Sequence, residues 1–214
     1  MNNYMYLIGK RARRASQYKI DTRIKNNVLA SYAKMLDENK DLIIKENTKD
    51  INYAKKIGLK ENLINRLHLN EKKINDIRSS IISIIRFKDP IDQVLEKWKR
   101  PTGLNISRVS IPIGVIGVIY ESRPNVTSDV ASLCFKSGNA VILRGGSEAI
   151  NSNRVLSKLF RKALKKNKVD ENFIQFIDSK NRKMVDVMLS KMKEYIDVII
   201  PRGGKNLVRK VQEL

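Results

Sequence analysis

Two short apolar runs, each followed by a polar cluster, restrict the fold of this chain more than any other feature. The runs are Val115–Tyr120 and Ala140–Leu143, and both are rich in Val and Ile. They are too short for helices and lack a polar face, which is typical of strands buried on both sides. A helical pattern closed by Gly138 separates them. The stretch therefore predicts a strand–helix–strand unit.

The residues that follow each run have side chains suited to ligand binding. Glu121, Ser122, Arg123 and Asn125 follow the first run, and Arg144-Gly145-Gly146-Ser147-Glu148 follows the second. Ligands of open parallel sheets bind at the carboxyl ends of the strands. We therefore expect both clusters to lie at one site.

The same alternation continues to the end of the sequence. Further strands are predicted at 173–177 and 196–200, with helices at 154–166, 182–193 and from 206. The last strand runs into Pro201-Arg202-Gly203-Gly204-Lys205, so the Arg-Gly-Gly of Arg144–Gly146 occurs twice, each time at a strand-to-helix turn. Four strands with intervening helices predict an α/β fold with a parallel, doubly wound sheet.

The first part of the chain predicts helices and a hairpin. Residues 2–87 show helical spacing, with caps at Asp21-Thr22 and Asn70 and a stop at Gly58. Residues 94–110 alternate apolar and polar positions around Arg100–Gly103, which predicts a two-stranded hairpin. A hairpin alone is marginally stable, so we expect it to pack on the body or to pair with another subunit.

Each Arg-Gly-Gly turn suits an anion. Glycine lets a phosphate approach the free N–H groups of a helix start, and the arginine supplies a planar fork for its oxygens. Two such turns favour a dinucleotide or a phosphorylated substrate over two ordinary tight turns. The sequence has no G-x-G-x-x-G fingerprint, because Gly114 and Gly117 fall within a strand rather than after one.

Four further residues have a structural and a functional interpretation. Arg123 could bind a carboxylate or phosphate and Asn125 could donate to a developing oxyanion, or the loop could simply cap the next helix. Cys134 lies mid-helix among apolar neighbours, which favours a buried structural residue over a nucleophile. His68 is the only histidine, so no metal site is expected.

Charge and composition set the remaining alternatives. The formal net charge is +21, which raises nucleic-acid binding as one hypothesis. The lysines are dispersed, aromatic residues make up 6%, and Ile, Asn and Lys are over-represented, so compositional drift explains the charge better. A single cysteine and apolar runs of at most ten residues lead us to expect a cytoplasmic protein without a membrane span.

The sequence PIGVIGVIYESRPNVTSDVASLCFKSGNAVILRGGSEAINSN resembles the gamma-glutamyl phosphate reductases, also called glutamate-5-semialdehyde dehydrogenases, of the aldehyde dehydrogenase superfamily. The resemblance extends to DVIIPRGGKNLVRKV and, more loosely, to the N-terminal helices and the hairpin. It implies an aldehyde-dehydrogenase-like fold in which 1–214 is a cofactor-binding domain. This domain would comprise N-terminal helices (1–88), an oligomerisation hairpin (94–110) and a parallel βα unit (111–214).

The resemblance also implies an activity and a set of site residues. The family reduces L-glutamate 5-phosphate with NADPH to the 5-semialdehyde and phosphate, in proline biosynthesis. By position, Asn125 corresponds to the oxyanion-hole amide and Arg144 to a basic residue at the adenosine ribose. The other implied cofactor residues are Gly145, Gly146, Ser147, Glu148, Gly203, Gly204 and Lys205, and those near substrate are Glu121, Ser122 and Arg123.

The resemblance covers only part of the family's length. Its members are about twice as long, and their catalytic cysteine lies in a segment beyond the last residue of this sequence; Cys134 does not correspond to it. The chain thus resembles the amino-terminal half, and we expect very little activity from it alone. The alternatives are an NADPH-binding module, half of a split enzyme completed by a separate catalytic half, or a basic nucleic-acid-associated protein.

Overall fold

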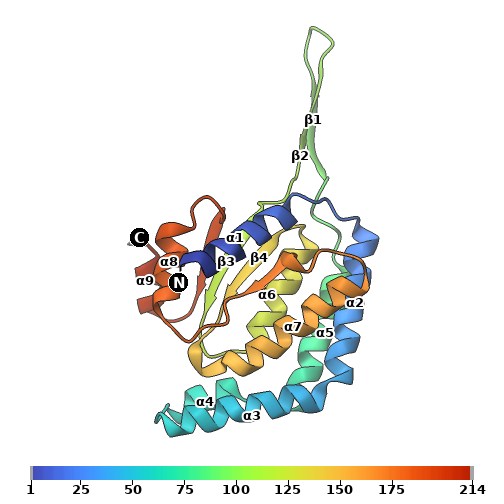
Figure 1. Ribbon diagram of the computed structural model, residues 1–214. Coiled ribbons are helices and arrows are strands. Elements are labelled where there is room, and N and C mark those ends of the chain that lie inside the picture. Colours follow the sequence, from blue (N-terminus) through green and yellow to red (C-terminus); the bar gives the residue numbers. More distant parts are fainter. Residues whose placement is uncertain (1, 213–214) are drawn as a thin grey trace.

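The structure is a computed structural model that describes residues 2–212. Its centre is a parallel four-stranded sheet with the strand order β5-β4-β3-β6, covered by helices on both faces (Figure 1). The strands are β3 (Val115–Tyr120), β4 (Ala140–Arg144), β5 (Ile174–Phe176) and β6 (Val198–Arg202). The predicted α/β fold with a doubly wound parallel sheet is confirmed.

The two apolar runs form the middle of this sheet. Every residue of β3 and β4 is buried, because helices cover both faces and leave no polar side to the strands. The helix α6 (Asn125–Lys136) connects them, and Gly138 ends the connection with a φ of 73°. This left-handed conformation favours glycine, as the sequence pattern predicted.

The helices form two layers on one face and one layer on the other. On the first face, α6 and α7 (Ile150–Lys166) pack on the sheet, and α2 (Thr22–Glu38) and α5 (Glu71–Arg86) pack on them. On the other face lie α1 (Asn2–Ser16) and α8 (Lys183–Lys191). Aromatic rings join the layers in a continuous core, with centroid distances of 4.4 Å for Tyr32–Phe160 and 5.6 Å for Phe135–Phe173.

The predicted helix caps are present. Asp21 accepts a hydrogen bond from Arg23 N at 2.8 Å, and Asn70 accepts one from Lys73 N at 2.9 Å. Between Gly58 and Asn70 the chain forms a short separate helix, α4 (Glu61–Leu67), which the helical spacing of residues 2–87 does not distinguish from its neighbours. The remaining elements are α3 (Lys40–Lys56), the 3-10 turns η1 (Ser147–Ala149) and η2 (Glu171–Phe173), and α9 (Lys205–Gln212).

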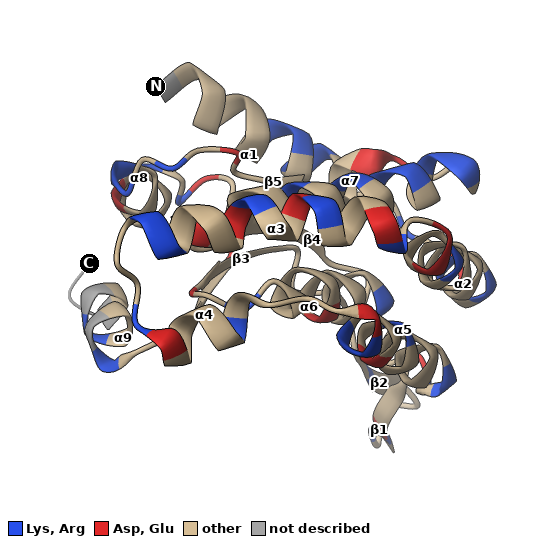
Figure 2. Cartoon of the chain, turned by 90° about the horizontal axis from the view of Figure 1, so that it is seen from below, with Lys and Arg blue, Asp and Glu red and all other residues tan. Residues whose placement is uncertain are grey.

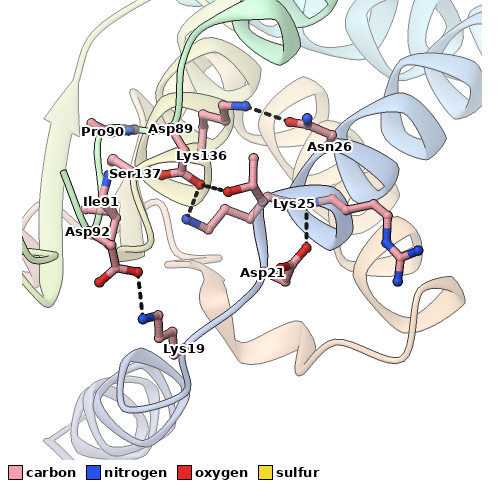
Figure 3. Close-up of polar contacts among 12 residues, drawn as sticks. Lys19, Asp21, Lys25, Asn26, Asp89, Pro90, Ile91, Asp92, Lys136 and Ser137 are labelled. Atoms are coloured by element: carbon pink, nitrogen blue, oxygen red, sulfur yellow. Dashed lines mark hydrogen bonds and ion pairs between the residues drawn. The ribbon is translucent and has the colours of Figure 1, made fainter.

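The hairpin of β1 (Val94–Lys99) and β2 (Asn105–Val109) extends away from the body (Figure 1). All six residues of β1 are exposed, so packing on the body, one of our two expectations, is wrong. Polar contacts instead anchor its base (Figure 3). Asp89 forms a buried ion pair with Lys25 Nζ at 2.8 Å and accepts a hydrogen bond from Thr22 Oγ1 at 2.7 Å. Asp92 forms an exposed ion pair with Lys19 at 2.6 Å.

Several boundaries differ from the prediction. The last strand begins two residues later than expected and continues through Pro201 and Arg202. A proline is tolerated there because β6 is an edge strand, which leaves one side without ladder hydrogen bonds. The predicted strand 173–177 is shorter, and residues 213–214 of the last predicted helix lie outside the described residues. No helix within 2–212 is both long and apolar enough to cross a membrane.

Candidate functional site

The predicted polar clusters meet at the carboxyl edge of the sheet. β3 lies between β4 and β6, with Ile119 opposite Arg144 and Tyr120 opposite Arg202. The two Arg-Gly-Gly turns therefore flank the loop that follows β3, as the parallel arrangement predicted. The helices α3 and α4 lie in front of this edge when the molecule is seen from below (Figure 2).

Three neighbouring hollows run along this edge, and we call them the first, second and third hollow. Their volumes are about 500, 430 and 460 Å³. Glu121 and Ser122 line both the first and the second, and Arg66 and Arg123 line both the second and the third. The loop after β3 thus contributes to all three.

Arg144 is buried at the wall of the first hollow. The residue is only 4% exposed, and one of its guanidinium nitrogens donates to the carbonyl of Gly145. Burial lowers the pKa of Arg144, and the neighbouring carboxylate of Glu148 opposes that change. Its Nε has no hydrogen-bond partner among residues 2–212. A buried charged donor of this kind suits a polar ligand group.

Glu148 joins the loops that follow β3 and β4. Its Oε1 accepts from Ser122 N at 3.0 Å and from Ser122 Oγ at 2.6 Å. A Cβ on Gly146 would overlap this carboxylate where it now lies, so a larger residue would displace the Glu148 side chain. In this structure the space beside the first Gly-Gly pair therefore holds a glutamate side chain.

Glu121 occupies the corresponding place at the second Gly-Gly pair. A side chain on Gly203 would approach Glu121 Cδ to 2.6 Å. Lys205 follows as the exposed first residue of α9. The sequence assigned both glutamates to a ligand site; only the structure shows that each lies against a glycine turn.

Asn125 and Arg123 lie at the third hollow together with residues that sequence reasoning missed. Asn125 Nδ2 donates to Asp129 Oδ2 at 2.9 Å. Arg66, Lys73, Asp76 and Asp129 also line this hollow. Asp129 could have been found from the sequence, because it lies one helical turn after Asn125. The sequence near Asn125 gives no indication of Arg66, Lys73 or Asp76, because they come from α4 and α5.

The remaining candidates are the buried Cys134 and His68, which lines the third hollow. Cys134 is 6% exposed, and burial raises the pKa of its thiol to about 12, which confirms the prediction of a buried structural cysteine. His68 is exposed, and its carbonyl accepts from Lys73 Nζ at 2.7 Å. The described residues contain no group of three His, Cys, Asp or Glu side chains that could hold a metal ion.

The first and second hollows fit a nicotinamide nucleotide in their chemistry. Arg144 and Arg182 supply cationic donors at the first, and Ser147 and Glu148 supply a hydroxyl and a carboxylate that can pair with sugar hydroxyls. The second is lined by Arg202 and by Gly204, whose backbone N–H donates to Glu121 Oε2 at 2.8 Å. These groups match the phosphates and riboses of such a ligand.

Comparisons with known proteins agree with the resemblance. No protein-family model matches the chain. It is 45% identical over 213 residues to a gamma-glutamyl phosphate reductase of Clostridium tetani, covering 99% of this chain and 50% of the relative. It is 46% identical over 206 residues to the one of Caldanaerobacter subterraneus, covering 95% and 50%. The chain spans about half the length of the curated relatives it matches.

Solved structures give the same result. Gamma-glutamyl phosphate reductase of Thermotoga maritima superposes with a TM-score of 0.94 at 40% identity, covering 97% of this chain and 50% of that one. A propionaldehyde dehydrogenase of Rhodopseudomonas palustris superposes with a TM-score of 0.70 at 14% identity, covering 98% and 44%. The second similarity concerns the fold alone.

Proposed function

We propose that this chain, which is homologous along its whole length to gamma-glutamyl phosphate reductases, is the amino-terminal, nucleotide-binding half of such a reductase. The reaction would be the reduction of L-glutamate 5-phosphate with NADPH to L-glutamate 5-semialdehyde and phosphate in the cytoplasm, as a step of proline biosynthesis. The observation that carries the proposal is the row of three hollows at the carboxyl ends of β4, β3 and β6.

In this proposal NADPH occupies the first and second hollows and supplies the hydride. Arg144, Ser147 and Glu148 bind its adenosine side beside Gly145 and Gly146. Gly203, Gly204 and Lys205 bind its phosphates. The support is chemical: Arg144 Nε lacks a partner among the described residues, and the net positive charge of +21 attracts anionic ligands.

The substrate lies at the third hollow, against Arg123 and Asn125, with Glu121 and Ser122 between it and the nucleotide. One N–H of Asn125 bonds Asp129, which leaves the other to donate to the oxygen of the reacting acyl group. The nucleophilic thiol comes from outside this sequence. Cys134 does not serve, because burial keeps its thiol protonated at neutral pH.

Titration of the chain with NADPH, followed by nucleotide fluorescence, tests the cofactor site. We expect saturable binding that Arg144→Ala weakens more than Cys134→Ala, since only Arg144 lines a hollow at the carboxyl edge. Thermal melts check that both variants fold. Equal losses in the two variants, or no saturable binding by the parent chain, would contradict the assignment.

A separate catalytic half is the second candidate. The chain covers 50% of the Clostridium tetani protein, and the remaining half of such a relative can be supplied as a separate chain to test this. Adding a chain that bears the cysteine segment should restore acyl-phosphate reduction if the two halves form a split enzyme. Nucleotide binding without restored activity would instead favour an independent NADPH-binding module.

The protruding hairpin is the proposed contact between copies. Leu95, Trp98 and Leu104 are 58, 40 and 60% exposed, and apolar side chains on a free hairpin favour an interface. Sedimentation should show an oligomer that dissociates on Trp98→Glu. A monomeric parent chain would contradict this contact.

Nucleic-acid binding remains the third candidate because of the positive charge. Lys and Arg are distributed over most helices and alternate with Asp and Glu, most visibly on α3 (Figure 2). Such mixing does not form the continuous basic stripe of a nucleic-acid interface. A steep decrease of nucleic-acid affinity with salt would favour this function; a flat dependence would eliminate it.

A further inference from the structure

The third hollow contains charged groups of both signs from four segments. Arg66 belongs to α4 and Arg123 to the loop after β3, and Asp76 and Asp129 belong to α5 and α6. Arg66 and Arg123 form no ion pair with any residue in the described part of the chain. Both arginines are exposed, so their guanidinium groups are open to an anionic ligand at this hollow.

Asp129 has an incomplete set of hydrogen bonds. Its Oδ2 accepts from Asn125. Its buried Oδ1 makes no well-formed hydrogen bond within 2–212, although the Ser80 hydroxyl lies near enough to the carboxylate to oppose the rise in pKa that burial causes. Buried carboxylate oxygens in native proteins nearly always accept hydrogen bonds. The χ2 angle of aspartate has a broad distribution, so a small rotation would present this oxygen to a donor in the hollow. A ligand ammonium group carries three such donors.

We propose that the third hollow binds the amino-acid end of the substrate, with the α-ammonium group on Asp129 and Asp76 and the α-carboxylate on Arg123 and Arg66. This inference rests on the proposed function and identifies the feature by which the site selects an amino acid. Its volume of about 460 Å³ lies within the roughly 300–1,000 Å³ typical of small-ligand pockets.

The two signs of charge have different consequences for specificity. The arginines attract any dicarboxylate, because both L-glutamate and its deaminated analogue glutarate present carboxylates to them. The aspartates favour only the ligand with an ammonium group, and repel one without it. Asp129 is therefore a specificity-determining residue, and Arg123 sets affinity without discriminating.

Calorimetric titration of the chain with L-glutamate and with glutarate tests this assignment. We expect L-glutamate to bind about tenfold or more tightly than glutarate, as for a charge-assisted hydrogen bond. Asp129→Asn should reduce this ratio to nearly one, and Arg123→Gln should weaken both ligands while keeping the ratio. Asp92→Asn, at the base of the hairpin, is the matched control and should change neither.

Three results would overturn the proposal: no saturable L-glutamate binding by the parent chain, equal affinities for the two ligands, or an unchanged ratio in Asp129→Asn. If Asp129→Asn fails to fold, the test rests on the ratio of L-glutamate affinity to glutarate affinity in the parent chain and in Asp76→Asn. We expect a smaller ratio in Asp76→Asn. NADPH titration of the same samples separates this result from the proposed function. Discrimination without nucleotide binding would refute the reductase assignment alone, and nucleotide binding without discrimination would refute only the ammonium site.

Discussion

Glu121 Oε2 accepts a hydrogen bond from the backbone N–H of Gly204 at 2.8 Å, across 83 positions of the sequence. The bond connects the ends of β3 and β6 at the carboxyl edge. A backbone N–H group at such a turn can donate a hydrogen bond to a phosphate oxygen. The carboxylate thus competes with an anionic ligand for the same donor.

Replacing Glu121 by glutamine should strengthen nucleotide binding. Glutamine keeps an acceptor for Gly204 N but removes the negative charge, so an incoming phosphate displaces it more easily. We expect NADPH affinity to rise by about threefold to tenfold, roughly the value of one screened charge interaction at a partly exposed site. Fluorescence titration at low salt measures the change.

The exposed Glu194 provides the matched control, because Glu194→Gln removes the same charge at a residue that lines none of the three hollows. Weaker NADPH binding by Glu121→Gln would contradict the competition and would indicate that the carboxylate itself contacts the nucleotide.

Asp50 of α3 caps a helix to which it does not belong. Its carboxylate accepts from Asn151 N at 3.1 Å, Ser152 N at 2.8 Å and Ser152 Oγ at 2.7 Å, all at the start of α7. Asp50→Ala leaves these buried donors without an acceptor, so it should lower the free energy of unfolding by about 2–4 kcal/mol. Urea denaturation measures this, with the exposed Asp41→Ala as control; similar losses in both would contradict the capping role.

Cys134 should be unreactive in the folded chain. Burial raises its pKa to about 12, and only the thiolate reacts with disulfide reagents. At pH 8 we expect modification by a chromogenic disulfide to be at least about a hundredfold slower than in urea. The unfolded chain is the internal control. Rapid modification of the native chain would mean that the helix α6 opens readily.

Asp197 should make the fold sensitive to acid. Partial burial acts to raise its pKa, but hydrogen bonds from Arg13 and from Val115 N outweigh this and lower it below the ordinary 3.8. A carboxyl whose pKa is lower in the folded state stabilises that state above its unfolded pKa. This stabilisation is lost as the pH falls below about 3.8.

The corresponding measurement is the unfolding free energy of Asp197→Asn between pH 6 and pH 3. We expect the difference in unfolding free energy between parent and variant to shrink toward acid pH. Protonation of Asp197 removes from the parent the same charge interaction with Arg13 that the substitution removes from the variant. Asp41→Asn is the control. A difference that stays constant through this range would show that the ion pair with Arg13 contributes no pH-dependent stability.

The sequence by itself determined the elements whose causes are local. The unbroken apolar runs of β3 and β4, the caps at Asp21 and Asn70 and the left-handed Gly138 each depend on residues a few positions apart. The parallel pairing then required the two Arg-Gly-Gly turns to share an edge. The family resemblance implied the activity, and the comparisons agree with the resemblance; the activity of this chain and the roles of the individual site residues stay predictions.

Only the tertiary structure decided which groups meet. Asp50 reaches α7 over about a hundred residues, Glu121 fills the Gly204 turn, and the third hollow combines α4 and α5 with the start of α6. No local pattern encodes such contacts, because they depend on how whole helices pack against the sheet edge. The same applies to the free hairpin and to the late start of β6, where neighbours in space, rather than neighbours in sequence, set the outcome.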